Sequence, residues 1–574
     1  MKRFLLIVGV LLVVVISFTV GAQEIGPGEG APIIEGNFSG SQNFSSLNPL
    51  RCSGTDCSVI TALLFPNLLG VDENGVIVPD AQDAVTKTWE VSEDGLTYTF
   101  HLRDDLYWSD GVQITANDLA FSIEAIFHSE EAEVAGGLSY LAGEIASYEV
   151  VDDFTLIIVL NTAACTNLVN ISFIPAVPLH VFGDDYTTLD YTTLNGHDFD
   201  TNPGVTSGVF DFLELIPGER VALSANQDYL WSMNDQVIPQ GYLYVDVPDQ
   251  TVQIERFLAG ELSLVSAVPT ASREQIRAAE NVQYYEYPGN TWGFIALNLA
   301  NPDNPQPGMD EAGAIIPQDP HPIFGDARVR RAMWMAMDVV GIIEAGMFGE
   351  GYPLPSYDII SSWAYDDTLA TVPYDVDAAG ALLDEAGWTM GDDGVRECHG
   401  CLYAEEGAKF SFELITNEGN EARGRMGVMA QDQLRQVGIE VIFTPMDFNT
   451  MVDLSVNQTY DAYLLGWNNG FPYDPDLSWL FLPEQDAPGF GYNDVSYYNP
   501  EFVDLINQAK NVPGCDTAAR AELYHEMQRI FQEDAPYIMI YSNTGMYAAS
   551  SDTENWVPYP NQLRRTISGW VRQP

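Results

Sequence analysis

Two patterns with different periods follow one another along the chain and together exclude a fold made only of helices or only of strands. Residues 87–103 alternate polar and apolar side chains around Asp94-Gly95, a turn pair that favours a β-hairpin. Residues 149–160 predict a second hairpin, whereas Thr115 precedes an apolar stripe typical of a capped amphipathic helix ending near Phe127. Helical periodicity returns at 324–346, 374–388, 421–437, 501–510 and 517–534. We therefore expect a mixed α/β fold.

The charge balance restricts the partners of the chain. Among 574 residues, 23 are Lys or Arg and 82 are Asp or Glu, which gives a formal net charge of −59. Hydrophobic residues make up 46 %, so the chain is globular, and its length predicts two or three domains of roughly 150 residues each. Nucleic acids and anionic lipids are recognised by basic patches, so neither is an expected partner. The acids are spread along the whole chain, which favours a role in solubility over the steering of cationic ligands.

The N-terminus has the pattern of an export signal. Lys2 and Arg3 precede an uncharged, mostly apolar run from Phe4 to Val20, and small residues follow up to Ala22. This order is typical of a signal peptide cleaved near Ala22, which is the interpretation we favour. The alternative is an uncleaved membrane anchor, because a run of this length can just span a bilayer. Either way we expect an exported protein, in the periplasm or on the outer face of the cell membrane.

Six cysteines in an exported chain predict disulfides. Cys52 with Cys57 and Cys398 with Cys401 are the local candidates, which leaves Cys165 and Cys515 as the third pair, although the sequence alone does not settle the pairing. Cys398-His399-Gly400-Cys401 could also be a metal or redox site. A zinc site needs about four ligands, and no second pair of this spacing completes one. We favour a structural disulfide there and expect no metal.

Several motifs occur in a fixed order between about residues 45 and 545. They are SLNPL at 46–50, the segment 68–122 with its DGVQITAND turn, PGVTSGVF at 203–210, GFIALN at 293–298, DARVRRA at 326–332, LLDEAGW at 382–388, YDAYLLGW at 460–467 and the helix 520–536. This ordered set resembles the family-5 solute-binding proteins of ATP-binding-cassette (ABC) importers, a group that includes oligopeptide- and dipeptide-binding proteins.

The resemblance implies a two-lobed α/β fold of the type II periplasmic-binding-protein kind, with an extra domain inserted in the first lobe. We expect a signal peptide at 1–22, lobe I at 23–71, 196–287 and 536–574, the inserted domain at 72–195, and lobe II at 288–535. The resemblance also implies a monomer without a cofactor or catalytic activity. Such a protein closes its lobes on a ligand and delivers the ligand to permease subunits in the membrane.

The resemblance places the ligand site after Gly466-Trp467. In peptide-binding relatives an Asp shortly after this pair accepts the α-ammonium of the peptide, a strong charge-assisted contact. Here Gly470 stands at the third position after Trp467, and the first carboxylate is Asp474. Asp474 either serves as the anchor or caps its own backbone in a turn, and we favour the turn.

Further candidate ligand residues are neutral. Trp467, Asn468, Asn469, Tyr473, Asn290 and Trp292 lie where relatives face ligand, although a buried Trp in the core is the alternative for Trp467. Tyr140 is a weaker candidate, for which we favour simple packing. Such groups suit sugars about as well as peptides, so an oligosaccharide-binding protein is the alternative to the favoured peptide-binding protein. A secreted hydrolase is the alternative from another class, but the chain contains no recognised nucleophile motif.

Overall fold

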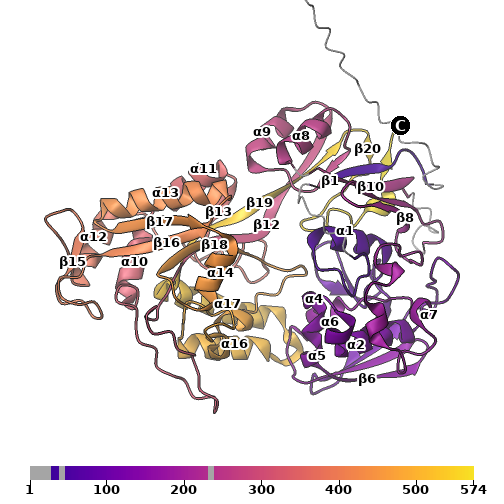
Figure 1. Cartoon of the computed structure of the whole chain (residues 1–574), viewed down its shortest axis with the longest axis horizontal. Helices are drawn as coiled ribbons and strands as arrows, with labels where there is room; N and C mark the ends of the chain where they lie inside the picture. Colours follow the sequence, from indigo (N-terminus) through magenta and orange to yellow (C-terminus); the bar gives the residue numbers. More distant parts are fainter. Residues whose placement is uncertain (1–27, 38–45, 230–237, 248) are drawn as a thin grey trace, which may run out of the picture.

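The computed structural model describes residues 28–37, 46–229, 238–247 and 249–574. It has the mixed α/β character that the sequence predicts, with one lobe at the left of Figure 1 and a second lobe, carrying a smaller domain beneath it, at the right. The predicted signal peptide lies outside the described residues. Within the described part of the chain, no helix has both the length and the apolar character needed to cross a membrane.

One eleven-stranded sheet runs through both lobes. Its lobe II strands are β17 (Glu440–Met446), β16 (Ser411–Asn417), β18 (Ala462–Asn468) and β13 (Gly351–Pro353), and its lobe I strands are β11 (Leu264–Val265), β1 (Ile33–Asn37), β10 (Gly241–Asp246), β9 (Arg220–Ala225) and β8 (Phe210–Ile216). The long strands β12 (Val282–Leu297) and β19 (Tyr537–Ser550) pair with each other and pass from one lobe to the other (Figure 1). Their register shifts between Pro288 and Trp292. This break in the ladder lies between the lobes and is the natural place for them to bend.

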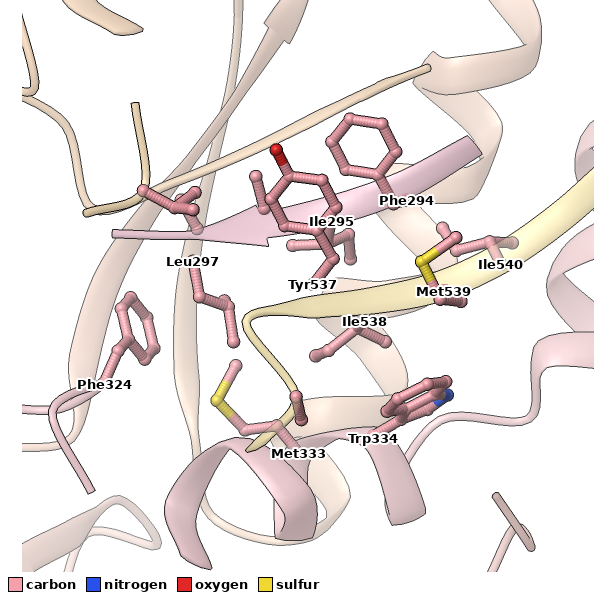
Figure 2. Close-up of a cluster of buried hydrophobic side chains, with 14 of the residues drawn as sticks. Phe294, Ile295, Leu297, Phe324, Met333, Trp334, Tyr537, Ile538, Met539 and Ile540 are labelled. Carbon is pink, nitrogen blue, oxygen red and sulfur yellow. The ribbon is translucent and has the colours of Figure 1, made fainter. Parts of the chain in front are cut away.

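Lobe II has a dense aromatic and aliphatic core around these two strands. Phe294 from β12 stacks on Tyr537 from β19 with 4.3 Å between ring centroids, and both side chains are fully buried. Met333 and Trp334 from a neighbouring helix close the other side of the cluster (Figure 2). The helices of this lobe are α10 (Ala327–Met335), α11 (Val339–Met347), α12 (Val376–Glu385), α13 (Glu421–Gln436), α14 (Phe448–Val456), α15 (Ser478–Phe481), α16 (Pro500–Lys510) and α17 (Thr517–Asp534), with the small hairpin β14 (Trp388–Met390) and β15 (Arg396–Cys398).

The helical periodicity of 324–346 corresponds to two helices. The first ends at Met335, and the second begins at Val339 after Asp338, whose side chain accepts a hydrogen bond from the Gly341 N–H. The apolar side chains continue through the break, which is why the sequence reads as one element.

The smaller domain is a four-stranded antiparallel sheet in the order β4 (Thr86–Val91), β5 (Thr97–Leu102), β7 (Thr155–Leu160), β6 (Ile145–Asp152). The two predicted hairpins supply these strands, and β5 and β7 bury every second side chain beneath α2 (Ala116–Phe127). Shorter helices complete it: α3 (Ser129–Ala132), α4 (Gly136–Ser139), α5 (Leu141–Glu144), α6 (Asn167–Ser172) and α7 (Leu179–Phe182).

Lobe I adds α1 (Thr55–Leu64), α8 (Gln250–Leu258), α9 (Arg273–Ala278) and the strand pair β20 (Thr553–Glu554) with β21 (Val571–Arg572), and β2 (Gly70–Val71) pairs with β3 (Ile77–Val78) at the junction with the smaller domain. Most of the buried side chains of lobe I and those of the smaller domain form one continuous hydrophobic cluster, the side chains around α8 and α9 form a small cluster of their own, and lobe II has a separate one. The smaller domain and lobe I are therefore coupled by packing more tightly than either is to lobe II.

A capping box begins α2 and gives a first testable prediction. The Thr115 hydroxyl accepts a hydrogen bond from the Asn117 N–H, and the Asp118 carboxylate accepts one from the Thr115 N–H at 2.8 Å. Thr115→Ala is expected to lower the free energy of unfolding by about 1 kcal/mol, while Thr115→Ser keeps the cap and should change it little. Urea unfolding of the two variants checks this, and equal destabilisation by both would contradict the role of the hydroxyl.

Candidate functional site

A cleft of about 490 Å³ lies between the smaller domain and lobe II. Its volume falls in the range of about 300–1,000 Å³ typical of ligand pockets. One wall comes from the smaller domain and the other from the loop that follows β18, together with the last residue of α16. The residues that line it are Tyr140, Glu144, Thr162, Ala164, Thr166, Asn167, Val169, Asn170 and Phe173 on the first side and 468–474, 476–479 and Lys510 on the second.

Asn469 is held in this wall by two residues that the sequence singled out. The Trp292 indole N–H donates to Asn469 Oδ1 at 3.0 Å, and Asn290 Nδ2 donates to the Asn469 carbonyl at 2.6 Å. The Asn469 N–H in turn donates to the Asn290 carbonyl at 2.9 Å. Trp292 is only 1 % exposed and packs in the lobe II core, so it has no ring face to offer a ligand. Trp292 and Asn290 position Asn469, and Asn468 beside it is exposed to the cleft.

Asp474 is engaged by a cation within the protein. Both its carboxylate oxygens accept hydrogen bonds from Arg520 at 2.7 Å, and the two side chains are 11 % and 6 % exposed. The favoured turn is also present, because Asp474 Oδ1 accepts a hydrogen bond from the Asp476 N–H at 3.1 Å. Burial acts to lower the pKa of Arg520, but the hydrogen bonds and charge of Asp474 outweigh it and raise that pKa. A ligand ammonium would therefore compete with Arg520 for this carboxylate.

Tyr473 is likewise tied to lobe II. Its hydroxyl donates to Asp358 Oδ1 at 2.6 Å, and Asp358 is 1 % exposed. Burial raises the pKa of Asp358 to about 6 and raises the pKa of the Tyr473 hydroxyl as well. The hydrogen bond fixes the Tyr473 ring at the edge of the cleft.

An aromatic cluster packs beneath the lobe II wall of the cleft. Trp467 meets Trp479 edge to face with 5.3 Å between centroids, and both contact Tyr492. Trp479, 38 % exposed, lines the cleft, while Trp467 supports it from behind. Across the cleft Tyr140 is 47 % exposed and lines the wall of the smaller domain, so part of its ring is accessible from the cleft. Trp479 and Tyr140 are thus the aromatic side chains that the cleft offers.

Several lining residues carried no signal in the sequence. Lys510, one of four lysines in the chain, ends α16 and donates to Ser478 Oγ at 3.3 Å. Asp476 lies beside it, and burial raises the pKa of this carboxyl group. Thr166 and Asn170 come from the opposite wall. Nothing in their spacing marks them, because the fold alone brings α6 and α16 to the same cleft.

The tip of the loop after β18 reaches the turn between β2 and β3. A Cβ built on Gly75 would stand 2.7 Å from the Phe471 ring, so this ring lies directly against the backbone of that turn. Phe471 and Pro472, joined by a cis peptide bond, also border a second cavity of about 340 Å³ that is lined mainly by lobe I. Phe471, Pro472 and Phe173 line both cavities, so the two cavities are neighbours at this loop.

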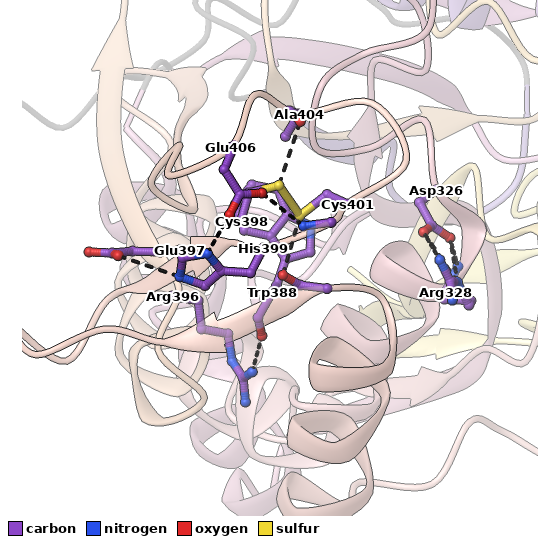
Figure 3. The surroundings of a disulfide bond; sticks show 12 residues. Asp326, Arg328, Trp388, Arg396, Glu397, Cys398, His399, Cys401, Ala404 and Glu406 are labelled. Carbon is purple, nitrogen blue, oxygen red and sulfur yellow. Dashed lines mark hydrogen bonds and ion pairs between the residues drawn. A yellow bond between two sulfur atoms is a disulfide. The ribbon is translucent and has the colours of Figure 1, made fainter.

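The six cysteines are joined in the three candidate pairs. Cys52 pairs with Cys57, Cys165 with Cys515, and Cys398 with Cys401. Figure 3 shows the last pair beside His399, whose Nδ1 lies 2.8 Å from Glu406 Oε1. A thiolate metal site would need free thiols, whereas here both sulfurs are bonded to each other, as in the favoured structural disulfide. Across the described ranges, no three His, Cys, Asp or Glu side chains come together as a possible metal site.

Comparison with known proteins agrees with this architecture. The family model of bacterial extracellular solute-binding proteins, family 5 Middle, matches residues 81–489. The oligopeptide-binding protein AppA of Bacillus subtilis is 24 % identical over 558 residues, covering 95 % of this chain and 92 % of AppA. The dipeptide-binding protein of Escherichia coli is 24 % identical over 534 residues, covering 89 % of this chain and 90 % of its own length.

Solved structures have the same fold. Bacillus subtilis AppA, determined in complex with a nonapeptide, matches with a TM-score of 0.70 at 22 % identity, covering 96 % of this chain and all (100 %) of AppA. The substrate-binding protein CtaP of Listeria monocytogenes matches with a TM-score of 0.75 at 21 % identity, covering 95 % of this chain and 100 % of CtaP. The expected two-lobed α/β fold is thereby confirmed.

Proposed function

Because this chain belongs to the bacterial extracellular solute-binding proteins of family 5, we propose that it captures an oligopeptide or dipeptide between its lobes and delivers it to the permease of an ABC importer. The observation that carries the proposal is the cleft between the smaller domain and lobe II, with polar and aromatic side chains on both walls. Relatives named for oligopeptide and dipeptide binding match nearly the whole chain.

The chemistry of the cleft suits a peptide. Asn468 and Asn170 offer amide donors and acceptors from opposite walls, and Trp479 and Tyr140 offer flat apolar faces. A peptide backbone can form hydrogen bonds with the amide groups, and the side chains of a peptide can pack against the aromatic faces. In this proposal the protein binds and releases its ligand unchanged, without catalysis.

The remaining assignments are part of the same proposal. We infer that the chain acts as an exported monomer outside the cell membrane, with residues 1–22 as its signal peptide. The division into lobe I (23–71, 196–287, 536–574), an inserted domain (72–195) and lobe II (288–535) is supported by the separate hydrophobic cluster of lobe II and by the separate four-stranded sheet of the smaller domain. The first residues of β19, Tyr537–Tyr541, pack in the lobe II core, so the strand belongs to both lobes.

Thermal unfolding in the presence of peptides and oligosaccharides tests the function. A ligand at about 100 times its dissociation constant stabilises by about 2.7 kcal/mol, which corresponds to a shift of a few degrees in Tm for a protein of this size. We expect peptides to raise the Tm and Trp479→Ala to abolish that rise. Phe448→Ala, which removes a 50 % exposed ring from another part of lobe II, is the matched control and should retain it.

Three outcomes separate the alternatives. Stabilisation that is lost when the peptide amino terminus is acetylated would support an ammonium site at Asp474. Stabilisation by oligosaccharides alone would contradict the peptide assignment and favour the sugar alternative. Recovery of a cleaved ligand after incubation would contradict a purely binding role.

A further inference from the structure

We propose that the Cys165–Cys515 disulfide is a covalent latch across the mouth of the cleft, which limits how far the smaller domain and lobe II can separate. The limit on separation follows from the position of the bridge and does not depend on the identity of the ligand. Its consequence for ligand exchange rests on the proposed function: with the latch intact, ligand enters and leaves through a narrower opening and therefore more slowly.

The bridge joins the two walls of the cleft. Cys165 lies between Ala164 and Thr166, which both line the wall of the smaller domain. Cys515 follows α16, whose last residue, Lys510, lines the opposite wall. The two cysteines are 350 residues apart in sequence, and their Cα atoms are 5.3 Å apart. The Cys165 N–H also donates to the Lys510 carbonyl at 2.9 Å, so backbone contact accompanies the covalent bond.

The natural bend between the lobes lies at the other end of the cleft. The ladder of β12 and β19 is interrupted between Pro288 and Trp292, and Asn469, at that end of the wall, bonds to Asn290 within the interruption. Figure 1 shows β12 and β19 crossing between the lobes near the upper side, whereas α16 approaches the smaller domain near the lower side. Two lobes that bend at one end open by separating at the other. The disulfide holds that other end, because a cystine keeps its Cα atoms within about 7 Å.

Each half of the bridge is attached to a rigid body. The smaller domain shares a continuous core with lobe I. On the other side, α16 and α17 are anchored in the lobe II core through Phe502, Ile506, Tyr524 and Phe531, each at most 1 % exposed. The loop with Cys515 is held at both ends by these helices, so the bridge restricts how far the two bodies can separate at this end of the cleft.

The two other disulfides have no such role. Cys52–Cys57 spans five residues and Cys398–Cys401 spans three, and each lies within one lobe. In an oxidising compartment the latch is closed. A dithiol reductant opens it by giving two electrons and two protons to the cystine: the S–S bond breaks, Cys165 and Cys515 become thiols, and the reductant becomes a disulfide.

Small-angle X-ray scattering of the ligand-free full chain tests the latch. We compare the wild type, the Cys165→Ser/Cys515→Ser variant and the Cys52→Ser/Cys57→Ser variant, the last as a matched control for loss of a disulfide within one lobe. We expect a larger radius of gyration only for Cys165→Ser/Cys515→Ser. Hydrogen exchange of the backbone amides in 162–170 and 468–479 should be at least about tenfold faster in the same variant, because these walls become open to solvent.

The same radius of gyration and the same exchange rates in all three proteins would overturn the latch. Circular dichroism establishes that each variant is folded. If Cys165→Ser/Cys515→Ser does not fold, folded wild-type protein is reduced and alkylated, and peptide mapping identifies the molecules modified at Cys165 and Cys515 for the same comparison. Because no ligand is used, failure of the latch leaves the peptide-induced shift in Tm unaffected, and failure of that shift leaves the scattering result intact.

Discussion

Arg520→Met is expected to lower the free energy of unfolding by about 3–5 kcal/mol, the usual cost of leaving one partner of a buried ion pair alone. Arg520 donates to both oxygens of Asp474, and its guanidinium also lies 5.1 Å from the centroid of the Trp363 ring. The substitution replaces the aliphatic stem of the side chain and removes the guanidinium, and so leaves the Asp474 carboxylate, 11 % exposed, without its cation. Urea unfolding gives the difference directly.

Two further variants make the result specific. Arg435→Met removes an ion pair whose partners are 74 % and 53 % exposed, and it should cost at most about 1 kcal/mol. Adding Asp474→Asn to Arg520→Met removes the stranded charge and should recover part of the loss. If Arg520→Met were as mild as Arg435→Met, the pair would not stabilise lobe II. The substitution also frees Asp474, so tighter binding of peptides with an unblocked amino terminus would show that Arg520 competes with ligand.

Thermal stability is expected to fall as the pH rises from about 5 to 8, because the environments of several buried carboxyl groups in lobe II favour the neutral form, most strongly those of Asp358, Asp486 and Asp494. Burial raises the pKa of Asp358 to about 6, of Asp486 to about 6 and of Asp494 to about 7, each well above the ordinary value of an aspartate. Between the unfolded and folded pKa values the folded protein holds more protons than the unfolded chain, so its stability is greatest below the unfolded pKa and is lost as the pH rises through the folded pKa.

Asp494 should contribute the largest part of this loss of stability with rising pH. It is 7 % exposed and accepts hydrogen bonds from the Tyr463 hydroxyl at 2.9 and 3.2 Å. A rise in the pKa of Asp494 to about 7 corresponds to roughly 4 kcal/mol of preference for the neutral form of its carboxyl group. Asp494→Asn mimics that form and retains an acceptor for Tyr463, so it should raise the Tm at pH 8 and flatten its pH dependence. A Tm profile between pH 5 and 8 that is identical in wild type and Asp494→Asn would contradict this prediction.

Helices and strands were predictable where a few neighbouring residues contain the turn or cap that defines the element. The Asp94-Gly95 turn and the Thr115 cap are visible in a few residues, and the structure has both the hairpin and the helix. The break at Asp338 was missed because its flanking residues are apolar on both sides. Periodicity reports which side chains are buried, and it does not register a change in helix direction that leaves burial unchanged.

The site was predictable on one wall only. The motif ending at Trp467 marks the loop after β18, and five of the eight predicted ligand residues line the cleft: Tyr140, Asn468, Asn469, Tyr473 and Asp474. The partner of Asp474 is 46 residues away on α17, so no local pattern could show that its carboxylate is already neutralised. Lys510 and Thr166 meet only through tertiary structure. Sequence patterns thus identify candidate ligand-binding side chains, while the tertiary structure determines which of them are already paired within the protein and which are available to a ligand.

The order of strands in the large sheet has a consequence for how the chain is made. β1, near the N-terminus, pairs with β10 and β11, and β11 pairs with β19, which ends at Ser550. Lobe I therefore cannot complete its sheet until nearly the whole chain has left the ribosome. Until then β11 and β12 present open edges that invite pairing with other chains. The lobe II part of the sheet also lacks a strand until β19 is synthesised, so this single late strand completes the sheet in both lobes. Truncation before Tyr537 would therefore leave neither lobe with a complete sheet.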